Sequence, residues 1–285
     1  MSDLFDARRC ELGEGAFWHP GRQQFFWFDI TGKALLSRER GNELRWQFDE
    51  CVSAAGWIST AELLVASETG LWKMDIESGR REIVARLPPE QHLRSNDGRA
   101  DPRGGFWIGT MGKQSEHEAG AIWRYYRGEM RKLYPGISIP NAICFDAERS
   151  LGYFADTRLK RIWSVRLDRD GWPAEEPGLF LDLTVSGVSP DGAVTDSEGS
   201  FWNAQWGASR VACYGPDSRE IAVHHFDAAR ISCPAFGGTD LDLLFATSAQ
   251  QGMTPEARLA EPCAGMTFCR AVPARGVAEH RVVLG

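Results

Sequence analysis

Four carboxylate or amide side chains occupy equivalent places in a pattern that recurs along the chain. They are Glu14, Asn96, Asn141 and Asp191, and each stands at nearly the same distance ahead of a short aromatic segment. Two carboxylates held close together repel, which raises the pKa of one of them, and a divalent cation removes that repulsion. Two carboxylates and an amide carbonyl form an oxygen ligand set suited to calcium, magnesium or manganese. Three protein ligands leave positions open for water and substrate, so the set predicts a catalytic metal site.

Each of these motifs has a simpler interpretation when it is taken alone. Asn96-Asp97-Gly98 and Pro190-Asp191-Gly192 are ordinary turn sequences, favoured for their local hydrogen bonds and left-handed backbone. Two further units carry small apolar residues at the equivalent place, Ala54-Ala55-Gly56 and Pro234-Ala235. The coincidence of phase over the other four units favours a shared site over four unrelated turns.

The elements that must position this site are short strands repeated along the whole chain. The aromatic or apolar segments recur about 38 to 48 residues apart, which is the period of propeller blades. Several are followed by a second strand-like segment, and no helix longer than a turn or two is needed. We therefore predict an all-β fold, a six-bladed β-propeller, with residues 1–285 forming a single domain. The segments are Phe25–Asp29, Leu63–Ser67, Phe106–Thr110, Tyr153–Thr157, Phe201–Gln205 and Leu244–Ser248.

The end of the chain suggests how the ring closes. The apolar stretch Arg281–Leu284 is predicted to supply a strand that closes the ring together with the N-terminal segment. The alternative fold, a β-sandwich with accidental spacing, is disfavoured because six matches extend over the full length.

Composition excludes several other classes of protein. The formal net charge of -7 and the lack of a basic run argue against a nucleic-acid partner. The apolar runs are too short to span a bilayer, and the N-terminus lacks the pattern of a signal peptide. Seven scattered cysteines without zinc-finger spacing favour reduced thiols. We expect a cytoplasmic protein, a monomer or weak homo-oligomer, that acts on a small molecule and does not bind membranes.

The sequence resembles the gluconolactonase and regucalcin (senescence marker protein) family of six-bladed propellers. The resemblance runs along essentially the whole chain. It implies that Glu14, Asn141 and Asp191 hold a divalent metal, while Arg94 and Asn96 contact a sugar lactone. The segments that carry it are Leu12–Gly15 with Trp18, Arg94–Met111, Ile139–Asn141 with Ala155–Thr157, and Pro190–Gly192 with Asp196, Gly199 and Trp202.

One position departs from the family pattern. Some relatives have a substrate-contacting glutamate where this chain has Gln114. Either Glu116 or Glu118 replaces it, or the substrate differs from that of these relatives; we assign the contact to Glu116. Trp206, just after the fifth aromatic segment, is a further candidate for the pocket wall.

The resulting hypothesis is metal-dependent hydrolysis of a sugar lactone to the aldonic acid. The metal would polarise the lactone carbonyl, and Asp191, the metal or both would activate the attacking water. The metal is one of calcium, zinc, manganese, magnesium and iron(II). Two alternatives stay open, a non-catalytic calcium-binding or scaffold propeller and an organophosphate-type hydrolase.

Overall fold

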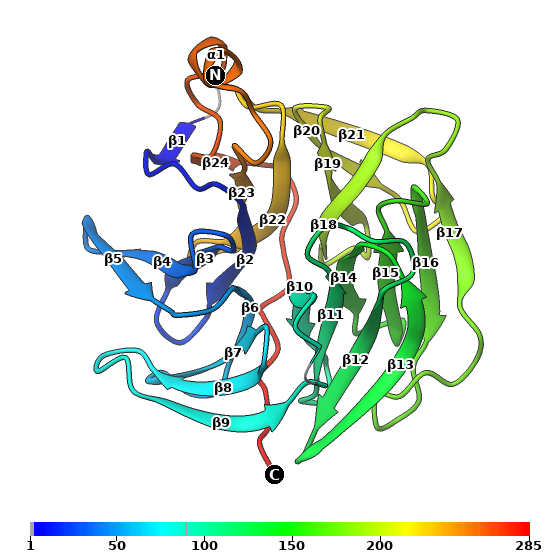
Figure 1. The fold of residues 1–285 in the computed structure, drawn as a ribbon. Coiled ribbons are helices and arrows are strands. Elements are labelled where there is room, and N and C mark those ends of the chain that lie inside the picture. The colour runs from blue at the N-terminus through cyan, green and yellow to red at the C-terminus, as the bar shows by residue number, and fades with distance from the viewer. Residues whose placement is uncertain (1–2, 89) are drawn as a thin grey trace.

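The computed structural model describes residues 3–88 and 90–285. Within them, the strands form six four-stranded antiparallel sheets arranged around a central axis, so the predicted six-bladed β-propeller is confirmed (Figure 1). The six sheets, numbered as blades in chain order, are β2 (Gly13–His19), β3 (Gln24–Asp29), β4 (Ala34–Glu39) and β5 (Asn42–Gln47); β6 (Val52–Trp57), β7 (Glu62–Ser67), β8 (Gly70–Asp75) and β9 (Arg81–Arg86); β10 (Leu93–Ala100), β11 (Phe106–Gly112), β12 (Gly120–Tyr126) and β13 (Glu129–Ile137); β14 (Pro140–Asp146), β15 (Leu151–Asp156), β16 (Arg161–Arg166) and β17 (Gly178–Asp182); β18 (Ser189–Thr195), β19 (Phe201–Trp206), β20 (Arg210–Tyr214) and β21 (Glu220–His225); β22 (Ile231–Gly237), β23 (Leu243–Ser248), β24 (Thr267–Ala271) and β1 (Asp3–Asp6).

The first strands of the blades surround the axis. β2, β6, β10, β14, β18 and β22 contact one another in a closed cycle. They are almost wholly buried, whereas the outermost strands, such as β5 and β21, consist of exposed and half-buried residues. The predicted aromatic segments are the second strands of the blades, with bounds that agree to within a few residues.

The core lies between neighbouring blades rather than inside any one of them. Phe28 and Leu35 of blade one pack in the same cluster as Leu63 and Val65 of blade two. A single four-stranded sheet cannot bury both of its faces, so each blade needs its two neighbours. This dependence explains why the repeats form a closed ring.

The N-terminal strand closes the ring. β1 pairs antiparallel with β24, placing Leu4 opposite Phe268, and so becomes the outermost strand of blade six. The prediction that Arg281–Leu284 would supply a closing strand is wrong. Arg281 forms only an isolated bridge with Trp57, because fully buried Val282 packs beside Gly56 and Phe106 instead.

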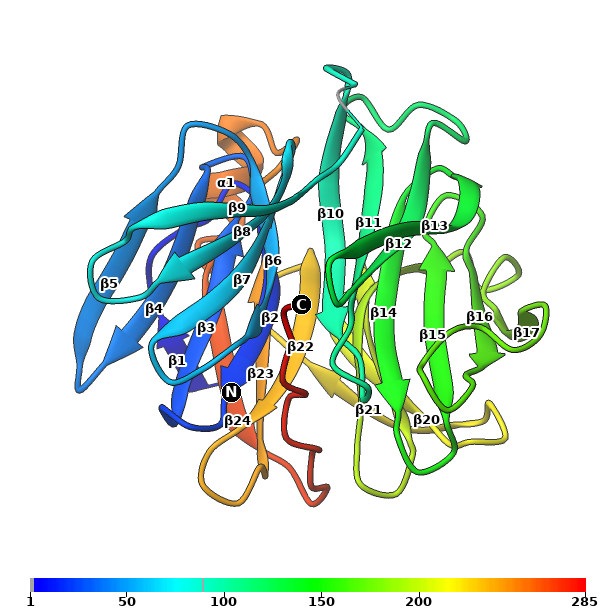
Figure 2. The ribbon, with the colours of Figure 1, turned by 90° about the horizontal axis from the view of Figure 1, so that it is seen from below.

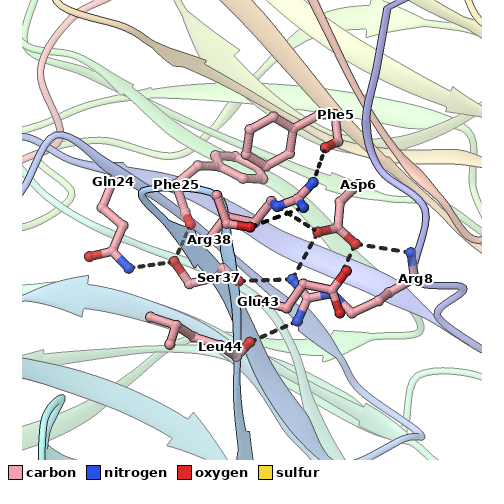
Figure 3. Close-up of polar contacts among 10 residues, drawn as sticks. Phe5, Asp6, Arg8, Gln24, Phe25, Ser37, Arg38, Glu43 and Leu44 are labelled. Carbon is pink, nitrogen blue, oxygen red and sulfur yellow. Dashed lines mark hydrogen bonds and ion pairs between the residues drawn. The ribbon is translucent and has the colours of Figure 1, made fainter.

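A buried carboxylate fastens the closing strand to blade one (Figure 3). Asp6 pairs with Arg8 at 2.9 Å and with Arg38 at 3.6 Å. Arg8 also donates to the carbonyl oxygens of Ser37 and Leu44, both at 2.8 Å. The strand of blade six is therefore tied to β4 and β5 of blade one by charge-assisted hydrogen bonds.

The C-terminal tail lies across the end of the channel formed by the carboxyl ends of the first strands (Figures 1 and 2). Gly276 bridges to Asp196 after β18, the Trp57 indole donates to the Glu279 carbonyl at 2.7 Å, and Val283 N donates to Gly104 O at 2.9 Å. All three contacts lie near the carboxyl ends of first strands. The tail therefore connects blades five, two and three.

Little helix accompanies the sheets. The short helix α1 (Pro255–Ala260) lies between β23 and β24, and Thr254 caps its N-terminus. Over the described residues, the structure contains no helix with the length and apolar character needed to cross a membrane. All seven cysteines are free thiols.

Candidate metal and substrate site

A β-bulge in each first strand turns a side chain toward the channel. In four blades the pairing register shifts around the predicted residue, between Glu14 and Phe17, Ser95 and Gly98, Asn141 and Cys144, and Pro190 and Ala193. Bulges re-aim side chains and are common beside active sites. The sequences that resemble turns are therefore bulged strands.

These bulges bring all four predicted residues of the ring to one pocket. The cavity has a volume of about 220 Å³ and lies at the mouth formed by the amino ends of the first strands. Trp206, a candidate from the sequence, is in its wall. The lining consists of Leu12, Glu14, Arg94, Asn96, Met111, Lys113, Ser115, Ile139, Asn141, Thr157, Asp191, Trp206 and Gln251.

Glu14 and Asp191 form a buried carboxylate pair joined by a hydrogen bond between their side chains. Only 5% and 4% of their surfaces are exposed. Burial, together with the nearby Asp97 carboxylate, raises the pKa of Glu14 to about 8. Burial and the Glu14 charge raise the pKa of Asp191 well above its ordinary value. The pair therefore retains a proton at neutral pH unless a cation replaces it.

Asp97, which the sequence suggested only as part of a turn, is a third buried carboxylate near this pair. Its two oxygens accept the backbone amides of Gly98 at 2.8 Å and Ile143 at 2.7 Å. Burial raises the pKa of Asp97 to about 6. Because its oxygens are engaged with the backbone, Asp97 ties blade three to blade four beneath the pocket.

A chain of hydrogen bonds orients the amide side chains. Asn96 Nδ2 donates to Asn141 Oδ1 at 3.0 Å, and Asn141 Nδ2 donates to Thr157 Oγ1 at 2.8 Å. Thr157 Oγ1 in turn donates to the Pro190 carbonyl at 2.6 Å, beside Asp191. Since the threonine proton is used on Pro190, Thr157 must accept from Asn141. The Asn141 oxygen is thereby turned into the site, and Thr157 is a positioning residue whose role the sequence did not reveal.

The donor set fits a hard divalent cation. It combines the buried Glu14 and Asp191 carboxylates with the oriented oxygen of Asn141, which keeps a second lone pair free. The described residues contain no group of three or more His, Cys, Asp and Glu that could hold a metal. A cation in this pocket would therefore rely on the Asn141 amide and on water or substrate to complete its coordination.

Arg94 is buried beside the amide chain. Its Nη1 donates to Asn96 Oδ1 at 2.7 Å and to Ser95 O at 2.9 Å. Among the described residues, its Nε and Nη2 have no hydrogen-bond partner, although the residue lines the pocket. The guanidinium thus has donors available for an oxygen of a ligand.

The loop after β11 differs from what the family resemblance suggests. Glu116 does not line the pocket, because its Oε2 folds back to accept the Gln114 amide at 3.0 Å. Glu118 is exposed, and its Oε1 lies 3.8 Å from His117 Nε2. Lys113 and Ser115 of the same loop line the pocket instead. A lysine and a serine in a polar loop carry no spacing signal that could have identified them from sequence.

Fold and site together define a class: a six-bladed β-propeller with an oxygen-rich pocket at one mouth of its channel. Residues 12–250 match the model of the SMP-30/gluconolactonase/LRE-like region, and the chain belongs to this family. The resemblance predicted from the sequence is thereby confirmed.

Several relatives are similar over nearly their whole length. A Rhizobium meliloti (strain 1021) protein with the provisional name sugar lactone lactonase is 41% identical, covering 93% of this chain and 92% of its own. An L-arabinolactonase of Azospirillum brasilense is 33% identical, covering 99% and 95%. The crystal structure of a calcium-binding protein, regucalcin, from Agrobacterium tumefaciens superimposes with a TM-score of 0.97, at 36% identity and with coverage of 100% and 98%.

Proposed function

We propose that this protein hydrolyses a sugar lactone to the corresponding aldonic acid. The observation that carries the proposal is one pocket that combines a buried carboxylate pair with unpaired donors of Arg94. Its relatives with lactonase names support the substrate class. An L-arabinolactonase and a 6-deoxy-6-sulfogluconolactonase of Pseudomonas putida are similar to this chain at 33% and 30% identity, so membership in the family does not specify the sugar.

Glu14, Asn141 and Asp191 would hold one divalent ion, which supplies Lewis-acid polarisation of the lactone carbonyl when bound. Arg94 and Asn96 orient the ring and hydroxyl oxygens, since Arg94 offers a planar fork of donors. Asp191 accepts a proton from the water that attacks the carbonyl carbon. The carbon–oxygen bond of the ring then breaks, and Asp191 returns the proton to the leaving oxygen.

A panel of aldono-1,4- and 1,5-lactones, followed by proton release with and without a chelator, tests this function. We expect rapid hydrolysis of at least one lactone, loss of the rate on chelation, and recovery with one equivalent of calcium, zinc, manganese, magnesium or iron(II). Turnover of every lactone at the uncatalysed rate, with a divalent ion bound, would contradict the proposal.

The same panel separates the two alternatives. The name of the Agrobacterium tumefaciens structure favours a calcium-binding protein as the second candidate. That candidate predicts one bound calcium ion per chain without turnover of any lactone. If the protein is an organophosphate-type hydrolase, it should release nitrophenol from a phosphotriester faster than it releases protons from any lactone. The cytoplasmic location and the monomeric or weakly associated state stay predictions.

A further inference from the structure

A second cavity lies beside the pocket on the same face of the molecule. It has a volume of about 580 Å³, whereas the pocket has about 220 Å³. Its walls include Glu68, Arg86, Glu90, Gln91, Leu93 and Lys113, from blades two and three and the connection between them. The proposed chemistry uses none of these residues. We refer to this cavity as the groove.

The groove and the pocket share a wall. Leu93 lines the groove and the next residue, Arg94, lines the pocket. On the paired strand, Met111 lines the pocket, and Lys113 lines both cavities. The two cavities are therefore neighbours that meet at Lys113.

An ion pair holds this separating side chain in place. Lys113 Nζ lies 2.7 Å from Glu68 Oε2, and Glu68 Oε1 accepts the Cys51 amide at 3.2 Å. The Lys113 backbone amide also donates to His92 O at 2.8 Å, which ties the connection between the blades to the end of β11. The Lys113 side chain is therefore held at the boundary between the pocket and the groove.

The lining of the groove suits a neutral polyhydroxylated group. Two cationic residues, Arg86 and Lys113, are balanced by Glu68 and Glu90, so the groove has no net charge to favour an anion. Among the described residues, neither the Arg86 guanidinium nor the Gln91 amide has a side-chain hydrogen-bond partner. Leu93 adds an apolar surface of the kind that packs against the face of a sugar ring.

We propose that the groove is a subsite for a second sugar unit, so that the preferred substrate is a lactone carrying a further sugar ring on a hydroxyl oxygen. This inference rests on the proposed lactonase function and extends it. The lactone ring occupies the pocket beside Arg94, and the second ring receives hydrogen bonds from Arg86 and Gln91. Hydrolysis itself is unchanged, since only the ring ester bond of the lactone is broken.

The test compares lactones with one and two sugar rings. The probes are D-glucono-1,5-lactone and the lactones of cellobionic and melibionic acids, which carry the second sugar on O4 and O6. We expect kcat/KM for at least one two-ring lactone to exceed that for gluconolactone by about tenfold. Arg86→Ala and Gln91→Ala should each lower the two-ring value by about fivefold to tenfold, the loss typical of one hydrogen bond. Both should leave the gluconolactone value within about twofold of wild type.

The control is Arg169→Ala, because the Arg169 side chain is 93% exposed and lies in blade four, away from the groove. It should change neither value. Slower hydrolysis of both two-ring lactones than of gluconolactone, or equal losses on all probes in Arg86→Ala, would overturn the proposal.

Calorimetry separates failure of the subsite from failure of the lactonase function. Cellobionic or melibionic acid should bind at least about fivefold more tightly than gluconic acid, and Arg86→Ala should remove the difference. Equal affinities of the acids would overturn the subsite even if every lactone is hydrolysed. Tighter binding of a two-ring acid without turnover of any lactone would support the subsite and overturn the lactonase function.

Discussion

At the scale of single residues, Glu14 and Asp191 determine what the pocket can bind. Burial and mutual repulsion make the doubly ionised pair unfavourable, and the hydrogen bond between them retains a proton. A divalent cation and this proton compete for the same oxygens. Metal affinity should therefore depend on pH.

The first prediction concerns the stability of the metal-free protein. Folding raises the pKa of both carboxyls. The contribution of Glu14 to stability is therefore full below about pH 4.5, the ordinary value for glutamate, and is lost as pH rises through about 8, and that of Asp191 is lost in the same direction. With a chelator present, the melting temperature should fall between pH 5.5 and pH 9. Saturating metal should remove most of this fall, and Glu14→Gln should weaken it. A chelated protein whose melting temperature is flat over this range would contradict the coupling.

The second prediction separates the two tasks proposed for Asp191. Asp191→Asn keeps the size and one carbonyl oxygen but removes the proton acceptor. Loss of a general base typically costs about 10²- to 10⁴-fold. We therefore expect kcat to stay at least about a hundredfold below wild type even at saturating metal. A metal titration of the variant is the measurement, and near-complete recovery would leave Asp191 as a ligand only.

At the scale of elements, the bulges in the first strands make the site. Gly15 and Ala142 follow Glu14 and Asn141 and have φ values of 57° and 56°. This left-handed conformation suits glycine and strains most other residues. The two blades therefore use the same backbone geometry with different residues to aim a side chain at the channel.

The third prediction concerns Gly15, whose place is taken in blade four by Ala142. A Cβ on Gly15 would lie 2.1 Å from the Ser53 carbonyl oxygen, in the neighbouring blade. Gly15→Ala should lower the melting temperature by at least about 4 °C, corresponding to at least about 1–2 kcal/mol in a large single domain, and weaken metal binding by displacing Glu14. Ala142→Gly is the matched control, since relief of strain offsets the added flexibility of glycine. Equal melting temperatures for Gly15→Ala and wild type would refute this account of the bulge.

At the scale of the whole molecule, the two chain ends stabilise the ring at different places. The N-terminal strand completes blade six, and its buried Asp6 ties that blade to blade one. The C-terminal tail crosses the far end of the channel and forms the ion pair of Glu279 with Arg99. Because the tail contacts three blades, it links parts of the ring that have no contact through strand pairing.

The fourth prediction concerns this ion pair. Arg99 is buried, and Glu279→Gln removes its ion-pair partner, a type of change that typically costs about 3–5 kcal/mol. Glu279→Gln should lower the free energy of unfolding in urea by an amount toward the lower end of that range, because the pair retains some exposure. Combining Arg99→Met with Glu279→Met should recover much of the loss, since apolar replacement of a buried pair is often neutral. A stability of Glu279→Gln equal to that of wild type would show that the tail does not fasten the ring.

Much of the architecture follows from the sequence because it is periodic. Each blade repeats the same alternation of aromatic strand and turn, so the spacing of segments such as Phe106–Thr110 determined the number of blades and their second strands. The same phase placed Glu14, Asn96, Asn141 and Asp191 at one mouth of the channel, since equivalent positions of a ring face one axis. The single-domain organisation and the roles of these residues stay predictions.

Contacts between distant segments could be decided only by the tertiary structure. Arg281–Leu284 and Asp3–Asp6 are both short terminal segments with two or three apolar residues, and the packing of Val282 beside Gly56 decided which of them closes the ring. Glu116 turns away from the pocket, and Lys113 reaches it, because the fold of the loop after β11 directs them. The sequence by itself determined the repeat and the phase of the site. Which terminal segment closes the ring, and which loop residue reaches the pocket, depends on packing between segments that are far apart along the chain.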